Sequence, residues 1–146
     1  MRTIIHILMA TLLATTTAEA AETIATCDAP ADRIVMSDPD DARQIADEWE
    51  DDRLGTGLKF VISGDEVDIA FTVGGSVRSE GGEVIRLPIG RPDRDISLLA
   101  VNPVLQTATM YTLSRDNQGR MSVLMQMVRA SDVLRTGMLL TAKCTR

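Results

Sequence analysis

Residues 107–129 read as two strands joined by a tight turn, and this hairpin restricts the chain to folds that contain an antiparallel sheet. Asp116 suits the first position of a type I turn, and Gly119 suits the left-handed residue that closes a short hairpin loop. Because side chains alternate along a strand, the turn also predicts a register with one apolar face. The paired residues on that face are Leu113 with Val123, Tyr111 with Met125, and Thr109 with Met127. We expect Tyr111, Leu113, Val123, Met125 and Met127 to be buried together.

A second hairpin is predicted over residues 58–73. Gly64 and Asp65 form a two-residue loop with glycine at the first central position, as a type II′ turn requires. Counting back from this loop pairs Ser63 with Glu66, Ile62 with Val67, Phe60 with Ile69, and Leu58 with Phe71. The three apolar pairs share one face, so the turn and the alternation agree.

Further short strands are expected at residues 32–36, 83–89, 96–101 and 136–144, where Met138, Leu140, Ala142 and Cys144 share a face. The connections between strands are tight, and a parallel sheet would need crossover helices that the pattern lacks. The predicted fold class is therefore mainly β, at the margin of α+β. An antiparallel meander would form a small barrel or a sandwich.

One N-terminal helix is expected to pack on this sheet. Asp38 can cap it, Pro39 fits the first helical position, and Asp40 and Asp41 suit the positive end of the helix dipole. The apolar stripe of this helix consists of Ala42, Ile45, Ala46 and Trp49. The helix should end by Gly55.

Residues 1–20 have the three parts of a secretory signal. Arg2 is followed by a short apolar run and then by small residues up to Ala20, where cleavage is expected. The apolar run is shorter than the roughly 20 residues that a bilayer-spanning helix needs. The sequence thus predicts a signal peptide over residues 1–20 and a single exported β-rich domain over residues 21–146, located in the periplasm or outside the cell.

The two cysteines, Cys27 and Cys144, are predicted to form a disulfide in an oxidising compartment. The bond would close a loop of more than a hundred residues, for which the chain-entropy model gives about 4.7 kcal/mol of stabilisation. A redox or zinc role is disfavoured, because the chain has no Cys-x-x-Cys and no third thiolate. The alternative is lipidation of Cys27, although this residue lies far beyond the apolar run.

The net charge is −6, and it remains −6 after signal cleavage because the segment removed contains one base, Arg2, and one acid, Glu19. This charge disfavours nonspecific binding to nucleic acid or to anionic lipid, whose phosphates attract basic surfaces. It is compatible with a basic envelope protein as partner.

Catalytic machinery is hard to find in the exported part of the chain. The one histidine, His6, lies in the signal segment, and neither Gly-x-Ser-x-Gly nor Ser-x-x-Lys occurs. Carboxylate pairs working with arginines stay possible, but we expect a protein that is not an enzyme.

No cofactor or metal is predicted. Asp38, Asp40 and Asp41 are potential calcium ligands, yet the EF-hand spacing is missing and helix capping already explains them. Met121, Met125 and Met127 would suit cuprous copper, but methionine is more often an adaptable core residue.

Two loops are candidates for contact with a ligand or partner. The glycine-rich residues 74–82 look like a flexible connection, and residues 90–95 are rich in turn formers. The candidate contact residues in them are Gly74, Gly75, Ser76, Arg78, Arg91 and Arg94.

The expected function is that of a non-catalytic binding or envelope-associated protein. Two alternatives remain. The chain would carry a small apolar ligand if its sheet closes around a cavity. A carboxylate-based enzyme is the other alternative.

Overall fold

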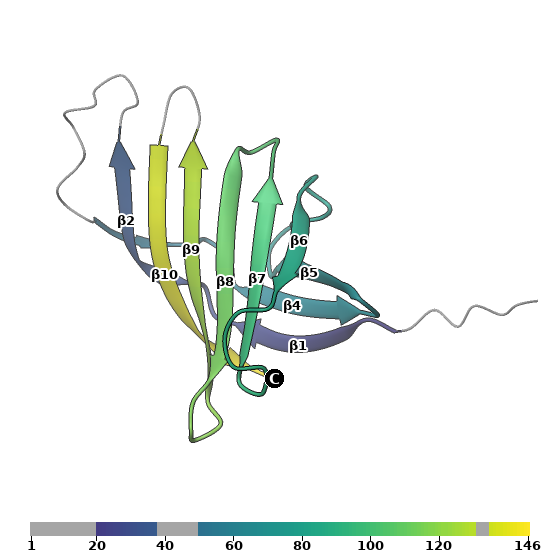
Figure 1. The fold of residues 1–146 in the computed structure, drawn as a ribbon. Coiled ribbons are helices and arrows are strands. Elements are labelled where there is room, and N and C mark those ends of the chain that lie inside the picture. Colours follow the sequence, from purple (N-terminus) through teal and green to yellow (C-terminus); the bar gives the residue numbers. More distant parts are fainter. Residues whose placement is uncertain (1–19, 38–49, 131–134) are drawn as a thin grey trace, which may run out of the picture.

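The computed structural model describes residues 20–37, 50–130 and 135–146, and within these ranges it contains ten β-strands and no helix. The strands are β1 (Glu22–Cys27), β2 (Ala31–Ser37), β3 (Glu50–Arg53), β4 (Leu58–Ser63), β5 (Glu66–Phe71), β6 (Glu83–Leu87), β7 (Asp95–Asn102), β8 (Thr107–Arg115), β9 (Met121–Ala130) and β10 (Arg135–Thr145). Figure 1 shows the long strands side by side, with β1, β4 and β5 crossing them at a steep angle.

All ten strands belong to one antiparallel sheet. Eight of them follow one another in the order β5-β4-β1-β10-β9-β8-β7-β6, and β2 and β3 lie off this path. From β6 to β10 each strand pairs with the next in the chain, so the predicted meander is confirmed. The edge strands β5 and β6 approach one another, and an isolated bridge joins Ala70 to Ser76 beside them. The sheet is therefore a nearly closed, eight-stranded barrel, with β2 and β3 outside this ring.

The strand β10 divides its second edge between two partners. Residues 135–141 of β10 pair with β2, whereas Cys144 and Thr145 pair with β1. Between β1 and β2 the chain bends at residues 28–30, where Pro30 has no N–H to offer a ladder. The carbonyl of Pro30 instead accepts from Leu54 N–H at 2.7 Å, which fixes the chain just after β3. This bend lets β1 turn toward β4 while β2 continues along β10.

The hairpin over residues 107–129 is confirmed with its register. Leu113 pairs with Val123, Tyr111 with Met125, and Thr109 with Met127. In the turn, Asp116 Oδ1 accepts from the backbone N–H groups of Gln118 and Arg120 at 2.8 and 2.9 Å, and Gly119 has a φ of 81°. Tyr111, Leu113, Val123 and Met125 are buried, but Met127 is only partly buried.

The hairpin over residues 58–73 is also confirmed. Its four predicted pairs, from Ser63 with Glu66 to Leu58 with Phe71, are the pairs of β4 and β5. Gly64 has a φ of 58°, and Asp65 does not share the left-handed conformation, as a type II′ turn requires. Leu58, Phe60 and Ile69 are fully buried, so this hairpin supplies much of the core.

The region between β2 and β4 differs from the expected one. Residues 38–49, which carry most of the predicted helix, lie outside the described residues. Residues 50–53 form the edge strand β3 and pair with β2, so the helix does not continue toward Gly55 as expected. The exposed Asp51 is ion-paired with Arg33 at 3.4 Å, and charged side chains of this kind are common on free sheet edges.

The predicted disulfide between Cys27 and Cys144 is present. The two residues are direct partners in the β1–β10 ladder, and their Cα atoms are 4.0 Å apart. Cys27 is buried, and Cys144 packs against the core together with Met138 and Ala142, on the same face as the buried Leu140. The bond therefore joins the first and last strands inside the sheet.

Candidate functional site

The barrel interior is filled near the disulfide and hollow toward the other end. Leu98, Leu113, Val123 and Leu140 are almost completely buried in the filled part. The hollow part is a cavity of about 240 Å³ where β7 ends and β8 begins. Its apolar lining includes Leu54, Phe71, Val77, Ala100, Met125 and Met127. Met127, which also lines this cavity, is only partly buried, which corrects the expectation of full burial.

Tyr111 forms the deep wall of the cavity. Its ring meets Phe60 edge to face, with centroids 5.8 Å apart and an interplanar angle of 75°. Burial raises the pKa of Tyr111 to about 12, and a hydrogen bond with the Thr109 side chain opposes that rise. The phenol is therefore neutral at physiological pH.

The raised pKa of Tyr111 predicts a loss of stability in alkali. Because the folded-state pKa of about 12 exceeds the ordinary value of 10.0, the stabilising effect is complete below pH 10 and disappears as the pH rises through 12. The full effect is about 2–3 kcal/mol. The chain has a single tyrosine, so phenolate absorbance during an alkaline titration reports this residue alone. Tyr111→Phe should flatten the fall in urea midpoint above pH 10, and a wild-type phenolate pKa near 10 would contradict the expectation.

Asn102 closes the cavity between the 103–106 turn and the 74–82 loop. Its Nδ2 donates to the Glu80 carbonyl at 3.1 Å, and its Oδ1 accepts from Leu105 N–H at 3.0 Å. Both ends of this buried amide are therefore occupied within the protein. The amide holds two loops together and leaves little capacity for a ligand.

The 74–82 loop, which the sequence predicts as a flexible connection, contains a turn that packs against β5. Val77 is buried and donates its N–H to the Ile69 carbonyl at 2.9 Å, and Phe71 N–H donates to the Gly75 carbonyl at 2.9 Å. Ser76 and Ser79 bond to each other through main chain and side chain. The loop contributes Val77 and Glu80 to the cavity. Gly74, Gly75, Ser76 and Arg78, which the sequence singled out, are not part of its lining.

Arg78 is held by the hairpin beside it. Its Nε donates to the Val67 carbonyl at 3.0 Å, and its guanidinium lies 3.8 Å from a carboxylate oxygen of Glu66. The Arg78 side chain therefore holds the loop against β5.

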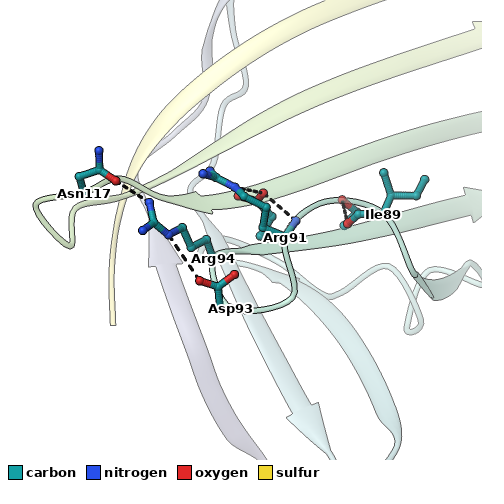
Figure 2. A network of polar contacts seen from close by, with 7 residues as sticks. Ile89, Arg91, Asp93, Arg94 and Asn117 are labelled. Carbon is teal, nitrogen blue, oxygen red and sulfur yellow. Dashed lines mark hydrogen bonds and ion pairs between the residues drawn. The ribbon is translucent and has the colours of Figure 1, made fainter.

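The other two candidate arginines lie in the 90–95 turn, at the far end of β6 from the cavity loop. Arg91 Nε lies 3.2 Å from a carboxylate oxygen of Asp95, and Arg94 Nε lies 3.5 Å from one of Asp93. Figure 2 shows Arg94 between Asp93 and Asn117. A hydrogen bond from the Arg91 backbone, and then one from its side chain, keep the pKa of Asp95 below its usual value. The two groups of predicted contact residues are therefore not brought together into one site.

Two charged residues lie at the cavity mouth, Glu80 and Arg129, and neither was identified as a candidate from the sequence. Arg129 pairs with Thr107, which also lines the cavity, and the alternation places it two residues beyond Met127 on the same face. The sequence pattern that could have identified Arg129 is a charged residue near the end of a strand, at a position that shares a face with apolar residues.

A second hollow lies on the outer face of the sheet, where it is lined by Leu99, Ala108, Met110, Val128 and Leu139 among others. It is an open depression over β7 to β10. The interior cavity differs from it in having walls on several sides and charged groups confined to one end.

Residues 20–37, 50–130 and 135–146 contain no cluster of three or more potential metal ligands and no helix that could cross a bilayer. The alternative calcium ligands Asp38, Asp40 and Asp41 lie outside the described residues. Comparison of the chain with family models, with curated proteins and with solved structures gave no match.

Proposed function

We propose that the chain is an exported, non-catalytic binding protein that holds a small, mainly apolar molecule in the cavity at the end of its barrel. The observation that carries this proposal is the cavity of about 240 Å³ in an otherwise well-filled interior. Protein interiors are close-packed, and voids much larger than a water molecule are few. This one has room for several water molecules, which suits a small ligand on the order of ten non-hydrogen atoms.

The character of the walls supports binding rather than catalysis. Apolar and aromatic side chains dominate the lining, and such pockets gain affinity mainly by removing apolar ligand surface from water. Tyr111, with a pKa of about 12, stays protonated and does not serve as a general base near neutral pH. The disulfide supports export, because such bonds persist in oxidising compartments. A basic envelope partner stays a prediction from the net charge.

A matched pair of variants tests the cavity. Ala100 lies on the inner face of β7 and lines the cavity, whereas Ala108 lies on β8 and lines the outer hollow. Ala100→Leu should fill part of the binding space, and Ala108→Leu should leave it open. With octanol as the probe, calorimetry should show saturable one-to-one binding to the wild type and to Ala108→Leu, with an affinity at least about tenfold lower for Ala100→Leu.

The binding should also have a negative heat-capacity change, as burial of apolar surface does. Thermal unfolding of both variants checks that they remain folded. Equal octanol binding by the two variants, or no binding to the wild type, would refute the proposal.

A further inference from the structure

We propose that the natural ligand carries a carboxylate, which binds Arg129 at the cavity mouth while its apolar part lies along Met127, Met125 and Tyr111. This inference rests on the proposed function, because it names the chemical class of molecule that the same cavity would hold. It requires that polar groups deep in the cavity be occupied, that Arg129 be available, and that the ligand have one orientation.

The deep polar groups are occupied. The Asn102 amide is shared between Glu80 and Leu105, and the Thr109 side chain lies beside the neutral Tyr111 phenol. A ligand head group placed there would lose its water without gaining new partners, which is costly for a charged group. The polar end of a ligand therefore belongs at the mouth.

Arg129 is a cation at that mouth. Six other arginines in the described part of the chain lie within 4.0 Å of a carboxylate; these are Arg33, Arg78, Arg91, Arg94, Arg120 and Arg146. Arg129 has no such pair within the described ranges, and its side chain is exposed. A guanidinium presents parallel N–H donors that match the two oxygens of a carboxylate. The Thr107 hydroxyl, directly across the ladder, can add another donor.

The strand geometry orients the ligand. Arg129, Met127 and Met125 follow one another at alternate positions of β9, so they share the inner face. Met125 and Arg129 are four positions apart, which is about 14 Å along the strand. A molecule with a short apolar chain and one terminal carboxylate fits this arrangement, with its chain over the methionines and its head at the guanidinium.

Glu80 is the competing group at the mouth, and it would favour an amine. No ion pair within 4.0 Å joins Glu80 to Arg129 in the described contacts, so the two side chains do not occupy one another there. The net charge of −6 also opposes anions at long range. That repulsion is screened beyond a Debye length of about 8 Å at physiological salt, whereas direct contact with Arg129 is screened less. We therefore assign the head group to Arg129.

Three probes with the same eight-carbon chain separate these possibilities: octanoate, octanol and octylamine. Calorimetric titration is expected to show wild-type affinity for octanoate at least about tenfold higher than for octanol, with octylamine the weakest. Arg129→Gln should remove the preference for octanoate while leaving octanol affinity unchanged. Rising salt should weaken only the octanoate complex.

Arg86→Gln is the matched control. Arg86 is exposed on β6, does not line the cavity, and its replacement changes the net charge by the same amount. This variant should keep the wild-type preference for octanoate. Thermal unfolding verifies that both variants are folded.

Octanol binding without a preference for octanoate, or a preference that survives in Arg129→Gln, overturns the carboxylate inference and leaves the apolar cavity as the binding site. Tighter binding of octylamine overturns it in favour of Glu80. Failure of all three probes to bind refutes the proposed function together with this inference.

Discussion

Replacing both Cys27 and Cys144 with alanine is expected to lower the free energy of unfolding by about 3–5 kcal/mol. The two residues are 117 positions apart, so the bond closes a loop that includes nearly the whole domain. In the chain-entropy model, its loss returns to the unfolded chain the loop-closure entropy that the bond removes. Urea unfolding should therefore shift to a lower midpoint. The slope m should increase as well, because the unfolded state becomes more expanded.

Reduction provides the control for this prediction. Wild-type protein in excess reductant should unfold near the midpoint of the double variant, and the double variant itself should not respond to reductant. If the double variant unfolded at the wild-type midpoint, or if reductant left the wild-type midpoint unchanged, the ladder between β1 and β10 would hold the first and last strands without the bond.

Leu140→Ala is expected to cost about 2–5 kcal/mol, the usual range for a buried leucine cut back to alanine. Leu140 has no exposed surface, and it lies in the centre of β10 opposite Met125 of β9. The substitution removes buried apolar surface and leaves a void that the surrounding sheet fills only in part. Chemical denaturation measures the loss directly.

Leu139→Ala is the matched control, because it makes the same chemical change one residue earlier on the opposite face. Leu139 is 38% exposed, so the loss should be less than about 1 kcal/mol. Similar losses for the two variants would contradict the observed assignment of the inner and outer faces of β10.

The two hairpins could be predicted because the residues that determine each of them are close together in the sequence. Asp116 with Gly119, and Gly64 with Asp65, fix the chain reversals, and the alternation on either side fixes the register. The disulfide was predictable because only two cysteines are available. In each case a few neighbouring or unique residues determine the result.

The strands β1 and β3 were missed because their partners are distant or their composition is unusual for a strand. β1 gains its place from β4 and β10, far along the chain. β3 is Glu50–Arg53, a charged segment with low strand propensity that is held by its ladder with β2. The choice of a barrel over a sandwich likewise depends on how the edges β5 and β6 meet.

The cavity was not predictable because a void is what remains after all the side chains have packed. The apolar pattern of Met125 and Met127 looks the same whether a strand faces a filled core or an open space. The glycines of residues 74–82 are equally uninformative, since they suit both a flexible loop and the packed turn that buries Val77. Charged residues in loops are typical of contact sites, which is why Arg78, Arg91 and Arg94 were candidates. Each of them, however, has a carboxylate beside it.

The two ends of the described chain lie together and far from the cavity mouth. Arg146 is 3.7 Å from Glu22, and along β10 Cys144 lies eight residues beyond Thr136, the partner of Arg129. That separation is about 26 Å, and Figure 1 shows the C-terminus at the end of the barrel opposite the tips of β7 and β9. A surface attached at either end of the described residues would therefore lie at the end of the barrel opposite the cavity, and the cavity mouth would face the solvent.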